Sequence, residues 1–233
     1  MSIAELTPIE AKARIVAQEC DVTGNRWEVL SDFYKLPHDV AGLRIVDICA
    51  GESDLTAVLT DLGADAVAVD MGYVDPNLLH QRKIRTFKSG LIRSGLDPES
   101  VARIQPAEFE RDTQRFMRSF VRNPERYISA SALALPFEEG RFDHVLSFFG
   151  IVGVFEEDMQ MLRKAMNEAI RVTKPGGQIQ IGPAADGTQT HQGRINTGRL
   201  VTELMARGDR LAVSTEFFEF RGLGSQRITM VKK

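Results

Sequence analysis

Short hydrophobic runs alternate with amphipathic stretches along this chain, and the alternation predicts strands separated by helices. The run LRIVDI (43–48) predicts a strand, SDLTAVLTDLG (53–63) a helix, and ADAVAVD (64–70) a second strand. A strand, a helix and a strand within so short a stretch form a compact βαβ unit, whose two strands run parallel. The pattern therefore indicates an α/β protein.

The second half of the chain continues in the same way. Further strands are predicted at 126–137, 142–153 and 178–183, and helices at 156–174 and 196–207. The last two β-rich runs, 210–220 and 226–233, are joined by the turn signal GLGS. They pair antiparallel, because a parallel return needs about a dozen residues. We expect a doubly wound, seven-stranded, mostly parallel sheet with one antiparallel strand.

Two regions stand outside this alternation. Residues 1–40 predict an N-terminal helical cap, which opens with a capping-box pattern at Thr7, Pro8 and Glu10. Residues 72–125 predict a helical insertion after the second strand, because more than fifty residues separate two strands that a simple crossover would join with far fewer. We expect residues 1–233 to form a single domain that carries both additions.

Positive charge is concentrated in the insertion. Residues 72–126 hold eleven Lys or Arg against seven Asp or Glu, although the whole chain has a net charge of −3 and a pI near 5.9. An acidic chain argues against a surface used mainly for nucleic acid or membrane, so such a partner would need a local patch. No run approaches the ~20 apolar residues of a membrane span. We expect neither a membrane span nor a nucleic-acid partner.

The cysteine content indicates the compartment. Only two cysteines occur, Cys20 and Cys49. That number is too small for a disulfide scaffold or a four-cysteine zinc site, and it is typical of a reducing environment. The opening residues carry acids and lack an apolar signal core. We therefore expect a cytoplasmic protein without a bound metal.

Four segments together resemble the class I S-adenosylmethionine-dependent methyltransferases. They are VDICAGESD (46–54), AVAVD (66–70), SASALALPFEEGRFDHVLS (129–147) and EAIRVTKPGGQIQIG (168–182). The last two are the more specific, because each is similar to a family pattern over a long stretch. The resemblance extends from Leu43 to the C-terminus and implies S-adenosylmethionine as cofactor, bound at the carboxyl ends of the first strands.

The first of these segments departs from the family's glycine pattern. Asp47 stands at the position of the acid and Gly51 at the central glycine, whereas Cys49 and Ser53 stand where the first and third glycines are usual. A turn beneath a cofactor needs glycine only where the backbone comes close to the ligand or adopts a positive φ, so one glycine can suffice. The alternative is that Gly51 is a plain turn glycine and Ser53 a helix cap.

Asp70 supports a nucleotide site on separate grounds. It ends an apolar strand about 20 residues after the glycine turn, where doubly wound folds bind ribose hydroxyls, and a carboxylate can accept from two neighbouring hydroxyl groups. A solvated acid at a strand end is the alternative. A dehydrogenase would use the same acid but needs G-x-G-x-x-G, which CAGESD lacks.

The resemblance implies further contacts to the cofactor. Ser131 stands where the family often has an aspartate that bonds the adenine amine, and Ala132 and Leu133 are expected to form an apolar wall. The expected cofactor-binding residues are Asp47, Cys49, Ala50, Gly51, Ser53, Asp70, Met71, Ser131, Ala132, Leu133 and Ser147.

The acceptor pocket is expected to be apolar, with Trp27, Tyr34 and Phe149 in its wall. For Trp27 and Tyr34, ordinary helical packing is the alternative. Arg115 and Arg118 share one helical face of the insertion and would attract an anionic acceptor. A solvated face balanced by nearby acids is the alternative for the arginines.

Two histidines are candidates for a general base. His80 lies in the insertion and His191 just beyond the fifth predicted strand, where a substrate could be met. A plain surface histidine is the alternative for each. Methyl transfer from a sulfonium often needs no strong base, because positioning of the nucleophile lowers much of the barrier.

The sequence therefore predicts a methyltransferase that acts on a small anionic molecule by direct methyl transfer. Two alternatives remain open. The chain could be a catalytically inactive, methyltransferase-like binding protein, or it could use the basic insertion to methylate RNA.

Overall fold

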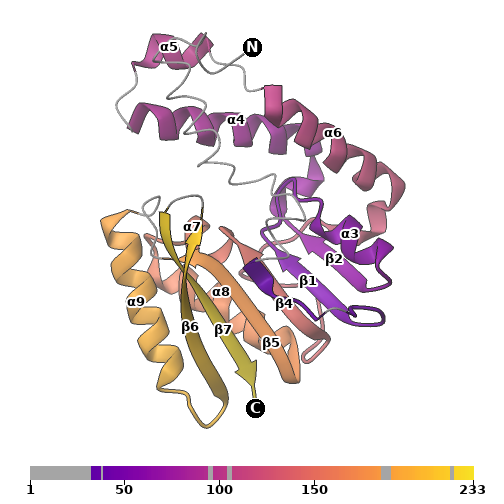
Figure 1. Cartoon of the computed structure of the whole chain (residues 1–233), viewed down its shortest axis with the longest axis vertical. Helices are drawn as coiled ribbons and strands as arrows, with labels where there is room; N and C mark the ends of the chain where they lie inside the picture. The colour runs from indigo at the N-terminus through magenta and orange to yellow at the C-terminus, as the bar shows by residue number, and fades with distance from the viewer. Residues whose placement is uncertain (1–32, 38, 94–96, 104–106, 185–189, 221–222) are drawn as a thin grey trace.

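The computed structural model describes residues 33–37, 39–93, 97–103, 107–184, 190–220 and 223–233 (Figure 1). Its strands are β1 (Arg44–Ile48), β2 (Asp65–Val69), β3 (Tyr127–Ile128), β4 (Phe142–Phe148), β5 (Thr173–Ala184), β6 (Leu211–Phe220) and β7 (Leu223–Lys232). They form one sheet in the order β3-β2-β1-β4-β5-β7-β6. Strand β7 runs antiparallel to both of its neighbours, and the pairs from β3 to β5 are parallel. The predicted sheet is confirmed.

Helices cover both faces of this sheet. They are α3 (Leu55–Asp61), α4 (Pro76–Arg93), α5 (Pro98–Arg103), α6 (Ala107–Arg122), α7 (Ile151–Val154), α8 (Met159–Val172) and α9 (His191–Met205), with short 3-10 turns η2 (Met71–Val74) and η3 (Pro124–Arg126). Helices α8 and α9 bury their apolar residues against one face, where Ile179 and Ile181 of β5 lie. Helix α3 packs on the other face, together with Phe33 and Tyr34. The sheet is doubly wound.

Several predicted boundaries are wrong, each for a local reason. The strand expected at 126–137 is confined to β3, because Ser131 Oγ accepts a hydrogen bond from Leu133 N and the chain turns away from the sheet. The strand expected at 142–153 ends at Phe148, since Phe149 has a φ of +51° and α7 follows. Helix α9 begins five residues early, because Thr190 caps it by accepting from Gly193 N.

The segment between β2 and β3 folds as η2, α4, α5, α6 and η3. Helix α6 is amphipathic, and its fully buried Phe116 packs against Tyr127 of β3. Just beyond α6, Arg126 forms an ion pair with Asp65 at the start of β2. Helix α6 therefore occupies the place of an ordinary crossover helix, while α4 and α5 lie beyond the ends of the strands (Figure 1). Most of the expected N-terminal cap lies outside the described residues.

Two of the motifs that carry the family resemblance contact each other. The Arg171 guanidinium binds both oxygens of Glu168 at 2.8 Å and donates to the carbonyls of Phe137 and Leu135 at 2.7 and 3.0 Å. Glu168 in turn accepts from Leu135 N at 2.8 Å. The acid and the arginine on α8 therefore fix the segment that follows β3. No helix in the described part of the chain is both long and apolar enough to cross a membrane.

We predict that Arg171→Met lowers the free energy of unfolding by about 1 to 3 kcal/mol, because two carbonyls and a carboxylate lose their charged donor. Chemical denaturation of the purified protein measures this change. Arg163→Met is the matched control, since Arg163 forms a similar two-point pair with Glu203 on the exposed surface. Such a pair contributes about 0.5 kcal/mol. Equal losses in the two variants would contradict the assigned role of Arg171.

Candidate functional site

The turn between β1 and α3 is the centre of the candidate site. Cys49 and Gly51 both adopt left-handed backbone conformations, with φ of +57° and +56°. For a residue with a side chain this conformation costs roughly 1–2 kcal/mol, which explains why the family prefers glycine where Cys49 stands. Ser53 has no such conformation, and its Oγ accepts from Leu55 N at 3.1 Å. Serine therefore replaces the third glycine without strain.

The carboxylate of Asp70 holds this turn in place. Its Oδ2 accepts from Gly51 N at 3.2 Å and its Oδ1 from Gly72 N at 2.7 Å. The hydroxyl of Tyr73 donates to Gly51 O at 2.9 Å, so both backbone groups of Gly51 are bonded to residues at or after the end of β2. The structure thus brings Asp70 to the glycine turn, as the spacing suggested. Contact of Asp70 with a ribose stays a prediction.

Asp47 is a buried acid at the foot of the same turn. It is 3% exposed, and its Oδ1 has no hydrogen-bond partner among the described residues. Burial, and then the charge of Asp70, raise the pKa of Asp47 to about 8. Burial and the two carboxylates also raise the pKa of the Cys49 thiol. The site therefore favours a neutral Asp47 when it is empty of positive charge, and a cation would favour the ionised form.

The segment that follows β3 lies next to the turn. Asp70 N donates to Ile128 O at 3.2 Å, so the segment with Ser131, Ala132 and Leu133 follows a strand next to Asp70. Ala132 is buried, whereas Ser131 and Leu133 are half-buried. Their contact with an adenine stays a prediction.

Ser147 has a structural role in the described structure. Its hydroxyl donates to Ile48 O and accepts from Ile151 N, each at 2.9 Å. A Cβ on Gly150 would lie 2.4 Å from Ser147 Oγ and 2.7 Å from Cys49 Cβ. Gly150 therefore lets the start of α7 approach the turn after β1 closely, and Ser147 holds it there. The remaining cofactor candidates differ in exposure: Ala50 is buried in the turn, and Met71 is exposed at its rim.

The expected aromatic wall of the acceptor pocket is not an open surface. Tyr34 is fully buried, and Phe149 is nearly so, in a cluster with Phe33 and Phe148. Burial, and then the charge of Asp47, raise the pKa of the Tyr34 hydroxyl well above its usual value. Trp27 lies outside the described residues.

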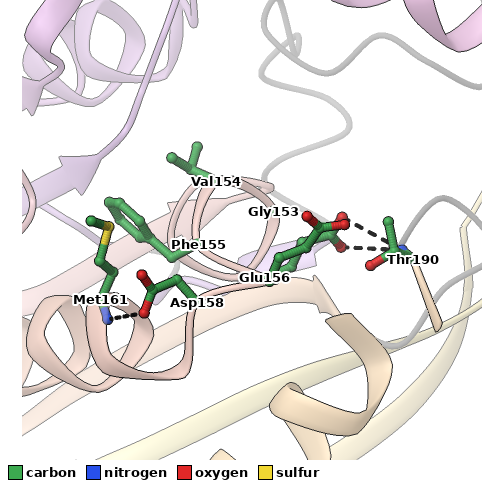
Figure 2. A pocket seen from close by; sticks show the side chains of 8 residues that line it. Gly153, Val154, Phe155, Glu156, Asp158, Met161 and Thr190 are labelled. Atoms are coloured by element: carbon green, nitrogen blue, oxygen red, sulfur yellow. Dashed lines mark hydrogen bonds between the residues drawn. The ribbon is translucent and has the colours of Figure 1, made fainter. Parts of the chain in front are cut away.

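A pocket of about 330 Å³ opens beside α7, at the end of that helix away from Cys49 (Figure 2). Its volume is at the low end of the ~300–1,000 Å³ of ligand sites. Exposed Val154 and Met161 and half-buried Phe155 give it an apolar side. Opposite them the Glu156 carboxylate accepts from Thr190 N (Figure 2).

The predicted histidines and arginines lie at different distances from the turn. His80 Nδ1 lies 2.7 Å from Thr113 Oγ1 and 3.8 Å from Glu52 Oε1, beside the turn that contains Gly51. His191 is exposed on the first turn of α9, next to Thr190. The exposed Arg115 and Arg118 lie along α6, which ends where Arg122 and Asp61 of α3 are 3.9 Å apart. Contact of Arg115 and Arg118 with an acceptor stays a prediction.

Three residues of the site were missed by sequence reasoning: Glu52, Tyr73 and Thr113. Tyr73 and Thr113 contact the turn through side chains of the segment that the sequence predicts as a helical insertion, and the pattern does not indicate which of its residues reach the turn. Glu52 is part of the motif itself, and the one available signal was an acid in an otherwise small-residue turn.

Comparison with known proteins identifies the family. Residues 25–185, more than half of the chain, match the ubiE/COQ5 methyltransferase family. The chain belongs to this family. The predicted class of methyltransferase is thereby confirmed, and the expected cofactor, S-adenosylmethionine, agrees with the membership.

The matches to individual relatives cover only part of each protein. A demethylmenaquinone methyltransferase of Clavibacter sepedonicus is 31% identical over 142 residues, which are 61% of this chain and 41% of that protein. One from Renibacterium salmoninarum is 28% identical over 143 residues, again 61% of this chain and 41% of that protein. The chain thus matches about two-fifths of the length of these curated relatives.

A solved structure supports the fold. The magnesium protoporphyrin IX methyltransferase of Synechocystis PCC 6803, with bound S-adenosylmethionine, has a TM-score of 0.51 to this chain at 12% identity. The match covers 98% of this chain and 86% of that one.

We predict that Asp47→Asn changes how stability depends on pH. The folded state raises the pKa of Asp47 from its usual value of 3.8 to about 8, so ionisation of Asp47 progressively destabilises the fold as pH rises through this window. Between pH 6 and pH 8 the wild type should lose up to about 3 kcal/mol relative to Asp47→Asn, at about 1.4 kcal/mol per pH unit. Denaturation at each pH measures the difference. Parallel stability curves would show that Asp47 is already ionised.

Proposed function

We propose that this chain is an S-adenosylmethionine-dependent methyltransferase that transfers the methyl group directly to a small-molecule acceptor. The observation that carries the proposal is the pair of acids, Asp47 and Asp70, on either side of the left-handed turn at Gly51. Asp47 has a buried oxygen without a partner among the described residues, and Asp70 presents a carboxylate at the end of β2. Family membership supports the same cofactor.

The chemistry of these residues fits S-adenosylmethionine. The unpartnered oxygen of Asp47 suits the positive end of the methionine part, because a cation stabilises a buried carboxylate. Asp70 can accept from ribose hydroxyls, since a carboxylate has more acceptor sites than its two backbone donors use. When bound, the cofactor supplies an electron-poor methyl group. The residues of the chain bind and orient it and exclude water from the turn.

The acceptor that we propose is a reduced quinone, methylated at a ring carbon. The family and its demethylmenaquinone-methylating relatives support this class. A quinone ring is electron-poor, whereas the two hydroxyl groups of the reduced form enrich the ring carbons, as attack on a methyl cation equivalent requires. The apolar side of the pocket beside α7, with Val154 and Phe155, suits such a ring. An anionic acceptor that binds at Arg115 and Arg118, as the sequence predicts, stays an untested alternative.

The two alternative functions, RNA methylation and binding without catalysis, predict different properties of the protein. An RNA methyltransferase would need a continuous basic surface near the turn, and its binding of RNA would fall steeply with added salt. An inactive binding protein would keep the cofactor site and transfer no methyl group. The acceptor assay below separates this second alternative from an enzyme.

We predict that Asp70→Asn weakens binding of S-adenosylmethionine by about 1 to 3 kcal/mol, because buried hydroxyl groups lose a charged acceptor. Titration calorimetry measures the affinity. Asp75→Asn is the matched control: Asp75 lies at the other end of η2, is exposed, and caps α4. Unchanged affinity in Asp70→Asn would remove this residue from the site, and absence of wild-type binding would refute the proposal.

We predict methyl transfer from radiolabelled S-adenosylmethionine to short-chain demethylmenaquinol, the reduced form of demethylmenaquinone. The oxidised quinone is the control and should accept no label, because its ring carbons are electron-poor. Label in the quinol product is measured after extraction. Tight cofactor binding with no label in any quinol would refute the acceptor and favour an inactive binding protein.

A further inference from the structure

Two polar side chains beside the turn after β1 are buried without a hydrogen-bond partner. The hydroxyl of Tyr34, in the segment before β1, and Oδ1 of Asp47, near the end of β1, have no partner among the described residues. Tyr34 is 0% exposed and Asp47 is 3% exposed. Buried polar atoms are nearly always paired, because an unpaired one loses its bonds to water and gains none in exchange. The two atoms therefore mark a place where a ligand could supply the missing bonds.

Tyr34 and Asp47 lie on the same face of the sheet. Ile45 and Asp47 are two positions apart on β1, so their side chains point the same way, and Ile45 packs in the cluster that contains Tyr34. Leu146, the register partner of Asp47 on β4, belongs to that cluster as well. Burial, and then the charge of Asp47, raise the pKa of the Tyr34 hydroxyl. The hydroxyl therefore keeps its proton and can act as a donor.

The segment that carries Tyr34 is fixed on both sides. Arg227 of β7 donates to the Phe33 carbonyl and to Glu216 of β6, and its guanidinium lies 5.9 Å from the centroid of the Phe33 ring. Lys35 donates to the same Glu216 and has a left-handed φ of +43°. A side chain at such a φ is disfavoured and persists only where its surroundings fix it. The two outer strands of the sheet thus hold Tyr34 in place.

The two buried atoms have complementary chemistry. Asp47 offers a hydrogen-bond acceptor, whereas the protonated hydroxyl of Tyr34 offers a donor. A free amino-acid group carries an ammonium and a carboxylate on the same carbon, so it needs an acceptor and a donor close together. The methionine end of S-adenosylmethionine is such a group. An acceptor alone would bind the ammonium and leave the carboxylate without a partner.

We propose that Tyr34 is a further cofactor-binding residue, whose hydroxyl donates to the carboxylate of the methionine end while Asp47 binds the ammonium. The inference rests on the proposed function. Both protein atoms are shielded from solvent, so the methionine end reaches them only when neighbouring side chains shift. The bound cofactor then supplies the two bonds that these atoms lack. This role differs from the place in the acceptor wall that the sequence predicts for Tyr34.

Two ligands that differ at the methionine end test the role of Tyr34. S-adenosylhomocysteine carries the amino-acid group, whereas 5′-methylthioadenosine keeps the nucleoside and the sulfur but lacks that group. In titration calorimetry, Tyr34→Phe should weaken binding of S-adenosylhomocysteine by about 10- to 100-fold, the usual loss for a hydrogen bond to a charged group. Its affinity for 5′-methylthioadenosine should stay that of the wild type. Equal losses for both ligands, or no loss for either, would overturn the proposal.

The stability of the free protein shows whether Tyr34→Phe acts through the ligand or through the fold. Removal of an unpaired buried hydroxyl should leave the melting temperature unchanged or raise it. Tyr127→Phe is the matched control, because the Tyr127 hydroxyl is bonded to Ser119. We expect the control to melt about 2 to 4 °C lower and to bind S-adenosylhomocysteine as the wild type does. A lower melting temperature in Tyr34→Phe would show that its hydroxyl has a partner within the protein, and would overturn the proposal.

The same titrations separate this inference from the proposed function. Asp70→Asn should weaken both ligands, because both carry the ribose. A wild-type protein that binds the two ligands equally well has no site for the amino-acid group, which overturns the role of Tyr34 and leaves the nucleoside site at Asp70 standing. Failure of the wild type to bind either ligand would refute the proposed function together with this inference.

Discussion

The hydrogen bond from Gly51 N to the carboxylate of Asp70 is the contact on which the site depends. It joins the loop after β1 to the end of β2, so the two strands of the βαβ unit share one carboxylate at their carboxyl edge. The second oxygen of Asp70 binds Gly72 N and starts η2. One side chain thus sets both the shape of the turn and the direction in which the next segment leaves the sheet.

That direction determines which residues reach the turn. Because η2 leaves the sheet beside Gly51, Tyr73 can donate to the Gly51 carbonyl and stack on Phe116 of α6. Helix α6 then brings Thr113 to Glu52. The segment that the sequence predicts as a helical insertion is therefore hydrogen-bonded to the turn after β1 at Gly51 and at Glu52.

The sequence predicts those parts of the site that depend on local pattern. The alternating apolar runs predict where the strands occur along the chain, and the place of Asp70 at the end of an apolar strand predicts its position beside the turn. The left-handed conformation of Cys49 could not be predicted, because a side chain at that φ is disfavoured and only the surrounding contacts maintain it. The contacts of Thr113 with Glu52 and His80 could not be predicted either, since Thr113 lies 61 and 33 positions away from them in the sequence. The apolar run at 126–137 predicts a strand, whereas most of it is a loop whose backbone binds Glu168 and Arg171. Periodicity alone does not distinguish such a loop from a strand.

The proton balance of cofactor binding tests the central claim most directly. If Asp47 is neutral in the free protein and faces the positive end of S-adenosylmethionine, binding near pH 7 must release about one proton, because the cation favours the ionised carboxylate. Titration calorimetry in two buffers of different ionisation enthalpy counts that proton, with Asp47→Asn as the reference. The account predicts release in the wild type and markedly less in the variant. Equal proton release in both proteins, or no binding at all, would contradict it.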